Sequence, residues 1–158
     1  IYQKVGFVTE TEYVFYKDIL PVQNYISSPN IVPYNQTHPT QIQRMDQQVS
    51  GEDRMFHFEK HLSNAYMYVT NNRVEGYYIP DFHEGLIVST SSKGGIELMA
   101  YRLMTKKNAV FPINNIEAIV YLRIQGLEPF KTAKRMRLGK IRSVAFSKIY
   151  NRISGSIG

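Results

Sequence analysis

The sequence has no cysteine among its 158 residues. This absence excludes disulfide frameworks, thiolate nucleophiles and cysteine-based zinc sites. It leaves the cellular compartment open, because reducing and oxidising surroundings both accept such a chain. We take the cytoplasm as the working expectation for its location.

The sequence also lacks a long hydrophobic run. No stretch approaches the roughly 18 consecutive apolar residues of a membrane-spanning helix, and the mean hydropathy is −0.31. With 43% hydrophobic residues, the chain has the composition of one soluble globular domain, and we expect no membrane partner. The first residue is Ile1, so we expect the natural N-terminus, and any targeting segment, to lie upstream.

Acidic residues are missing from the end of the chain. The net charge is +6, yet all 13 Asp and Glu lie at or before Glu128. The cations that follow Glu128 are Lys131, Lys134, Arg135, Arg137, Lys140, Arg142, Lys148 and Arg152. Such a block can attract nucleic acid, an acidic partner or cofactor phosphates. We favour a solvated strand face with a basic tail, and consider nucleic acid an unlikely partner.

Hydrophobic periodicity predicts alternating strands and helices. Strands are expected at 5–16, 31–34, 64–70, 73–79, 85–90 and 108–111, and also near 127–130, 133–138 and 144–150. Helices are expected at 40–49, 52–62, 96–106 and 115–125. This order predicts an α/β fold of the α+β type, with a mixed, mostly antiparallel sheet flanked by helices.

One stretch breaks the pattern. Four prolines between residues 18 and 39, together with several Asn and Ser, predict an irregular segment, and we interpret 18–30 as a linker.

A motif appears near the end of the chain. Its residues are Asn115, Ala118, Tyr121, Leu122, Gly126 and Leu127. They resemble the pattern N-x-x-A-x-x-L-Y-x-x-x-G-F of the GNAT superfamily of acetyl-CoA-dependent acetyltransferases. In that pattern Asn caps a helix, Ala lets the helix approach the cofactor, and Gly turns the chain into a strand.

The end of the same pattern, Y-x-K-x-G-F, recurs as Tyr2, Lys4, Gly6 and Phe7. Gly6 and Gly126 are 120 residues apart, about one GNAT domain. The resemblance therefore implies a tandem protein, with 1–17 ending one copy and 31–158 forming a C-terminal GNAT-like copy. Further residues that resemble this second copy are Asp46, Gly51, Asp53, Arg54, Gly76, Tyr77, Pro112, Met136, Gly139, Gly155 and Gly158.

The resemblance implies a site for acetyl-CoA. In GNAT enzymes, backbone N–H groups between the fourth strand and the next helix bind the cofactor pyrophosphate. The residues at the corresponding positions are Val88, Ser91, Ser92, Lys93, Gly94, Gly95 and Asn115. The family's Q/R-x-x-G-x-G/A string is absent, and an ordinary capped helix start is the alternative reading.

A tyrosine protonates the departing thiolate in the family. The second copy has Leu122 at that position, and Tyr121 lies about 100° away around the helix. The first copy keeps the tyrosine as Tyr2, our candidate catalytic residue. A packing aromatic is the alternative for Tyr2.

Two other groups are weighed and set aside. His57 and His61 are four residues apart, but the glutamate of H-E-x-x-H is missing, and we expect no metal site. Asp53 and Arg54 could face a substrate; we favour a helix-start carboxylate beside a surface arginine.

The resemblance leads to an expected function. This is an acetyl-CoA-dependent N-acyltransferase that acts on a small-molecule or peptide amine, with this chain as its C-terminal portion. The alternative is a non-catalytic GNAT-like module for binding or dimerisation, with a homodimer as one arrangement. A nucleic-acid binder that uses the basic block is a third.

Overall fold

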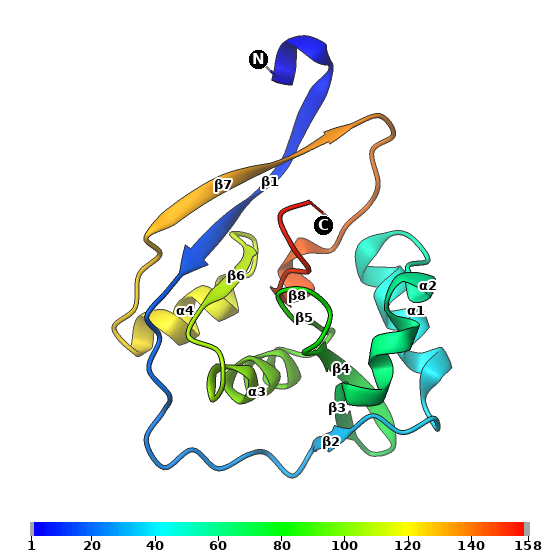
Figure 1. Ribbon diagram of the computed structural model, residues 1–158, viewed down its shortest axis with the longest axis vertical. Helices are drawn as coiled ribbons and strands as arrows, with labels where there is room; N and C mark the ends of the chain where they lie inside the picture. Colours follow the sequence, from blue (N-terminus) through cyan, green and yellow to red (C-terminus); the bar gives the residue numbers. More distant parts are fainter. Residues whose placement is uncertain (1, 157–158) are drawn as a thin grey trace.

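The computed structural model describes residues 2–156 as two antiparallel sheets with helices packed around them (Figure 1). The strands are β1 (Phe7–Tyr16), β2 (Ile31–Pro33), β3 (Tyr66–Thr70), β4 (Arg73–Ile79), β5 (Leu86–Ser89), β6 (Ala109–Pro112), β7 (Lys131–Leu138) and β8 (Ile149–Asn151). The helices are α1 (Pro39–Ser50), α2 (Met55–Phe58), α3 (Ser92–Leu103) and α4 (Ile116–Ile124), with 3-10 turns η1 (Tyr2–Val5), η2 (Glu59–Asn64) and η3 (Phe146–Lys148).

The larger sheet has the order β2-β3-β4-β5-β8 and is covered on both faces. Successive side chains of a strand point to opposite faces. Tyr77 of β4 therefore packs in one core with Ile42 of α1, while its neighbour Tyr78 packs in a second core with Leu98 of α3. A sheet buried on both faces explains why β5 is apolar at nearly every position.

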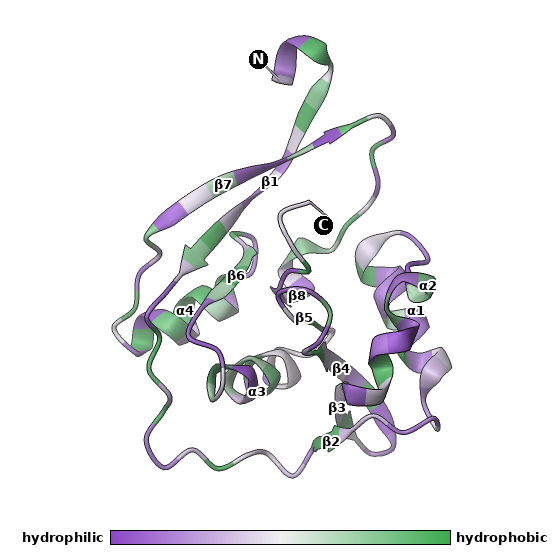
Figure 2. Cartoon of the chain, viewed as in Figure 1, coloured by the Kyte–Doolittle hydropathy of each residue, from purple (hydrophilic) through white to green (hydrophobic). Residues whose placement is uncertain are grey.

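The smaller sheet has the order β6-β1-β7, so the N-terminal strand lies between two strands from the second half of the chain. β1 pairs with β7 from Phe7↔Leu138 to Phe15↔Lys131. We call η1 and the start of β1, residues 2–10, the arm, because it projects beyond the rest of the molecule (Figure 1). Figure 2 shows hydrophobic residues where the end of β1 approaches β6 and α4, at the second core.

The C-terminal strand β8 joins the two sheets. Its residues pair with β5 as Ile87↔Asn151 and Val88↔Ile149. On the other side, the backbone N–H of Val110 in β6 donates to Asn151 Oδ1 at 3.0 Å, and the N–H of Arg152 donates to the Val110 carbonyl at 2.9 Å. Residues 149–152 therefore hydrogen-bond to both sheets.

The predicted α+β fold with mostly antiparallel strands and flanking helices is confirmed. Residues 18–30, which we interpreted as a linker, contain neither helix nor strand. Residues 7–16, which we assigned to an upstream domain, form the middle strand of a sheet built with β6 and β7. Of the residues quoted for the resemblance, Gly158 lies outside the described range.

Three predicted elements were wrong in detail. Residues 127–130 form no strand, because Pro129 has no N–H to donate to a ladder. The expected helix 52–62 is divided into α2 and η2. The expected strand 144–150 is mostly a loop with the turn η3, and only its end joins β8.

A buried polar network fixes α1 to the larger sheet. Arg54 donates from Nε and Nη2 to the Asp46 carboxylate, and the Tyr77 hydroxyl donates to Asp46 Oδ1 at 2.5 Å. Burial, followed by the charge of Asp46, raises the pKa of Tyr77 well above its ordinary value. The expectation that Arg54 lies at the surface is therefore wrong. Arg54 is only 7% exposed and pairs with Asp46 rather than with Asp53.

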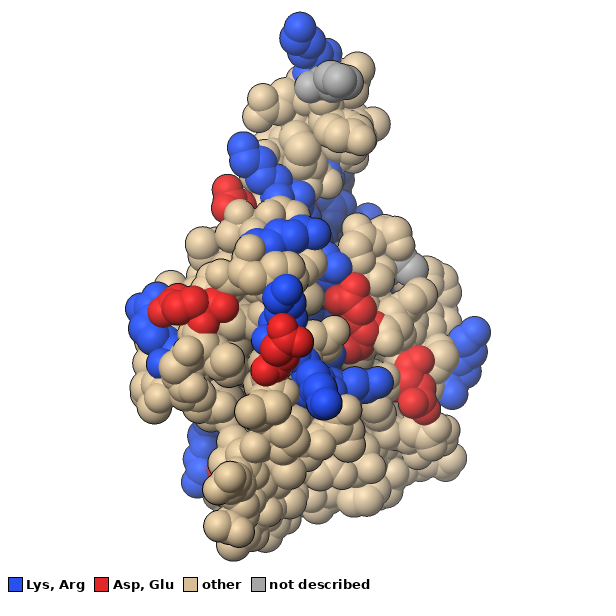
Figure 3. Space-filling view, turned by 60° about the vertical axis from the view of Figure 1, so that its left-hand side comes forward, with Lys and Arg blue, Asp and Glu red and all other residues tan. Residues whose placement is uncertain are grey.

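The basic C-terminal block meets acidic residues from earlier in the chain. Arg135 and Arg137 pair with Glu10, and Arg152 pairs with Glu84. A fourth pair joins Arg142 to Glu52. Figure 3 shows Lys and Arg side chains from the arm down into the body, with Asp and Glu beside several of them. Within residues 2–156, no helix has the length and apolar character needed to cross a membrane.

Replacing Arg54 with methionine should destabilise the fold strongly. The substitution leaves Asp46 buried without its countercharge, which costs about 3–5 kcal/mol. Urea unfolding followed by circular dichroism measures the change. Arg123→Met is the matched control, because the Arg123–Glu128 pair is exposed and should change stability by less than about 0.5 kcal/mol. Equal effects of the two substitutions would refute a structural role for the buried pair.

Candidate functional site

The predicted pyrophosphate loop is a capped helix start. Ser91 is the N-cap of α3, and its Oγ accepts a hydrogen bond from the Gly94 N–H at 3.0 Å. The Gly95 N–H donates to the Ser91 carbonyl at 3.0 Å, as in an ordinary first helical turn. Ser92 and Lys93 are exposed, whereas Gly94 and Gly95 are buried.

A side chain from β8 occupies the space above this loop. The ring of Tyr150 lies against Gly95 so closely that a Cβ there would be 2.1 Å from Tyr150 Cζ. Only glycine leaves room for this contact. Tyr150 is fully buried, and burial, followed by its hydrogen bond to Glu117, raises the pKa of its hydroxyl.

The other predicted cofactor residues meet the same segment. Val88 pairs with Ile149 at the edge of β5. Asn115 caps α4, as predicted, by accepting from the Ala118 N–H at 3.1 Å, and its Nδ2 donates to the Ile149 carbonyl at 2.9 Å. Val88, Gly95 and Asn115 therefore converge on Ile149 and Tyr150.

Glu117 connects the loop to Tyr150. Its carboxylate accepts from the Ser92 hydroxyl, and from the Tyr150 hydroxyl at 2.7 Å. The bond from Ser92, and then the bond from Tyr150, lower the pKa of Glu117. Sequence reasoning missed Glu117, Ile149 and Tyr150, since no local spacing links residues about 30 and 55 positions apart; only the glycine pair at 94–95 indicated that something approaches the loop closely.

Tyr2 lies away from this loop, on the arm. It is 65% exposed, and its ring packs edge-on against Phe7 with centroids 5.7 Å apart. Gly6 has φ of +90° and ends η1 before β1, just as Gly126, at +79°, follows α4. The two motif copies thus share a helical turn closed by a left-handed glycine.

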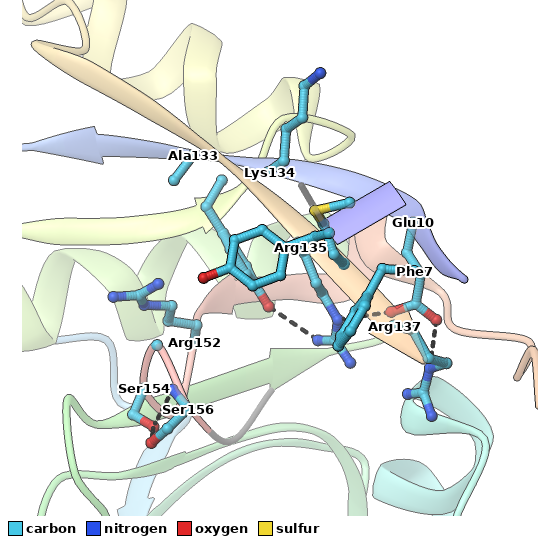
Figure 4. Close-up of a pocket in the computed structure, with 13 residues that line it drawn as sticks. Phe7, Glu10, Ala133, Lys134, Arg135, Arg137, Arg152, Ser154 and Ser156 are labelled. Atoms are coloured by element: carbon cyan, nitrogen blue, oxygen red, sulfur yellow. Dashed lines mark hydrogen bonds and ion pairs between the residues drawn. The ribbon is translucent and has the colours of Figure 1, made fainter. Parts of the chain in front are cut away.

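Tyr2 lines a cleft of about 540 Å³ between β1, β7 and the segment 154–156. Figure 4 shows Arg135, Arg137 and Glu10 in this cleft, with Arg152, Ser154 and Ser156 on the other side. The structure therefore brings the predicted catalytic residue together with part of the basic block, and separates it from the predicted cofactor loop.

The remaining candidates have ordinary structural surroundings. Leu122 is fully buried in the second core, whereas Tyr121 is half-buried at its margin. His57 lies in α2 beside Phe56, and His61 lies in η2 against Phe82. Among residues 2–156, no three His, Asp or Glu side chains are grouped as metal ligands.

Comparison with solved structures shows the fold. No protein-family model matches the chain, and neither does any curated protein sequence. A Pyrococcus horikoshii protein provisionally described as an acetyltransferase superposes with a TM-score of 0.78 at 20% identity, covering 99% of this chain. An acetyltransferase of the GNAT family from Colwellia psychrerythraea superposes with a TM-score of 0.54 at 10% identity, covering 85%. The fold is GNAT-like. This chain spans only 55% and 59% of those two proteins.

Within this GNAT-like fold, the contact between Gly95 and Tyr150 predicts a specific coupling. Gly95→Ala should lower stability by about 1–3 kcal/mol, because the added methyl overlaps the Tyr150 ring. In a Tyr150→Ala background the same change should be neutral or stabilising, since alanine favours a helix over glycine by about 1 kcal/mol. Urea unfolding of the four proteins of the cycle measures the coupling.

Gly94→Ala is the control for this cycle. The Cβ there would meet Ser91, Tyr68 and Ser89 instead of Tyr150. Its cost should therefore be the same with and without the Tyr150 ring. If the Gly95→Ala cost also survives removal of that ring, Tyr150 does not fill the space above the loop.

Proposed function

We propose that this chain is the C-terminal part of a two-domain, acetyl-CoA-dependent N-acyltransferase of the GNAT type. In this proposal the upstream copy binds acetyl-CoA and includes Tyr2, and the present domain shapes the acceptor site. The GNAT-like fold supports the reaction class, and the share of the Pyrococcus protein that the chain spans is compatible with a second domain.

The contacts of the predicted cofactor loop argue against acetyl-CoA binding there. Three of the residues that the resemblance assigns to acetyl-CoA, Val88, Gly95 and Asn115, contact the chain's own Ile149 or Tyr150. A cofactor at this loop would have to displace a buried tyrosine and break the pairing of β8 with β5. The residues present here therefore do not fit acetyl-CoA, and we assign no step of the reaction to them.

Tyr2 has properties that suit the proposed role. Tyr2 is exposed and lines a cleft. In acetyl transfer an amine forms a bond to the thioester carbonyl carbon and the carbon–sulfur bond breaks. A phenol at Tyr2 would give its proton to the departing thiolate, and the proton that the amine nitrogen loses as the amide forms would restore the phenol. The exposure of Tyr2 differs from that of a core aromatic, although its ring also packs against Phe7.

The closed loop also favours a second candidate function. A GNAT-like domain that has lost its cofactor site could serve only as a recognition or dimerisation module. The two candidates differ in one result, which is whether the protein that includes the residues upstream of Ile1 transfers acetyl groups at all.

Calorimetric titration with acetyl-CoA tests the proposal. This chain should show no binding, because Tyr150 covers the loop, whereas the protein with its upstream residues should bind acetyl-CoA. In that longer protein Tyr2→Phe should lower kcat by about 10²–10⁴ and leave the KM for acetyl-CoA unchanged. Binding of acetyl-CoA to this chain alone would contradict the closed site, and an unaffected kcat would exclude Tyr2 as the acid.

A further inference from the structure

The cleft beside Tyr2 contains three arginines connected in a row. The guanidinium of Arg152 lies over the Tyr13 ring, 5.2 Å from its centroid. Arg135 donates from Nη1 to the Tyr13 hydroxyl at 2.9 Å and from Nε to Glu10 at 2.9 Å. Arg137 donates from Nε to the other Glu10 oxygen at 2.6 Å. The row thus runs Arg152, Tyr13, Arg135, Glu10, Arg137.

Local strand geometry produces this row. Arg135 and Arg137 are two residues apart on β7 and therefore share one face of the strand. The pairing of β1 with β7 shifts between Thr9 and Thr11, which makes Glu10 the extra residue of a β-bulge. Figure 4 shows Glu10 beside both arginines, while Lys134 points away from them.

Positive charge exceeds negative charge in the row. Three guanidinium groups face two carboxylates, because Glu10 serves both Arg135 and Arg137 while Glu84 serves Arg152. The side chains of the three arginines are only 12–18% exposed. Water therefore screens this excess charge less than it would at the open surface.

The row also keeps hydrogen-bond donors available. Each guanidinium has five N–H donors in a planar fork. Arg137 uses Nε for Glu10, and neither of its Nη groups has an acceptor within residues 2–156. The Tyr13 hydroxyl accepts from Arg135, so its own proton can be donated to a ligand. Partly buried donors of this kind suit an oxyanion.

We infer that this cleft binds the carboxylate or phosphate of a small molecule through Arg137, Arg135 and Tyr13. The inference rests in part on the proposed function, in which that molecule is the amine acceptor and its amine faces Tyr2. The volume of about 540 Å³ accommodates a metabolite or a short peptide end. The acceptor is thus an amine that carries an anionic group.

Titration of this chain followed by ¹H–¹⁵N NMR tests the binding site directly. Succinate and inorganic phosphate are the probes, each compared with sodium chloride at equal ionic strength. At least one probe should shift the signals of β7 and Tyr13 saturably, and the tighter probe identifies the preferred group. Shifts that do not saturate, or that chloride reproduces, would overturn the site.

Two variants locate the binding. Arg137→Gln should lower the affinity for the tighter-binding probe at least about tenfold, because the substitution removes the free Nη donors. Arg137→Lys keeps the charge without the fork and should weaken it less, which provides a second measurement if the glutamine variant unfolds. Arg123→Gln removes an exposed arginine in α4, remote from the cleft, and should leave the affinity unchanged. Equal affinities in Arg137→Gln and Arg123→Gln would place the anion elsewhere.

Three acceptors separate this inference from the proposed function. With acetyl-CoA and the longer protein, β-alanine and O-phosphoethanolamine carry an anion, and propylamine carries none. At least one anionic acceptor should exceed propylamine in kcat/KM by about tenfold or more, and Arg137→Gln should abolish the preference. Transfer without any preference overturns the acceptor assignment alone. Saturable anion binding without acetyl transfer to any amine would support the anion site in the cleft and contradict the proposed acyltransferase function.

Discussion

The short segment from Ile149 to Arg152 determines how the two sheets are held together. Its backbone completes the edge of β5, and the Asn151 side chain bonds to β6 on one side and to the Gly85 carbonyl on the other. Asn151 is 1% exposed, so each of these bonds replaces contact with water that the buried groups cannot otherwise make. Because this strand lies where the two sheets meet, it also closes the site that the sequence motif suggests.

In this domain the GNAT-like motif around Asn115 and the cleft with the arginines therefore lie in different places. The residues around Asn115 still cap and shape α4 as the GNAT pattern implies, but their neighbours are protein atoms. The polar chemistry lies instead on β1 and β7, where Glu10, Tyr13 and the arginines meet. A local pattern can thus serve packing without forming the ligand site that it suggests.

Local signals predicted most of the fold. Ser91 and Asn115 are helix caps with side-chain acceptors in the expected places. Pairings between distant residues could not be predicted. Arg54 looked like a surface residue because its partner Asp46 lies in the preceding helix. The basic block looked unopposed because Glu10 is more than 120 residues away.

The same dependence on distance applied to the candidate site. The resemblance to the GNAT pattern placed Val88, Gly95 and Asn115 around one loop, and in the structure each of them lies against Ile149 or Tyr150. No spacing rule, however, could reveal that Tyr150 would lie among them. The pattern therefore identified where these residues meet, but not which side chain fills the space between them.

The position of β1 has a consequence for the synthesis of the chain. β1 is synthesised well before its partner β7, which begins 115 residues after the end of β1. The junction between the two sheets forms later still, because it requires Asn151. Folding that depends on such remote contacts is slow, and unpaired strand edges remain exposed meanwhile. In a nascent chain the edges of β1 would therefore stay accessible to chaperones until β7 has been added.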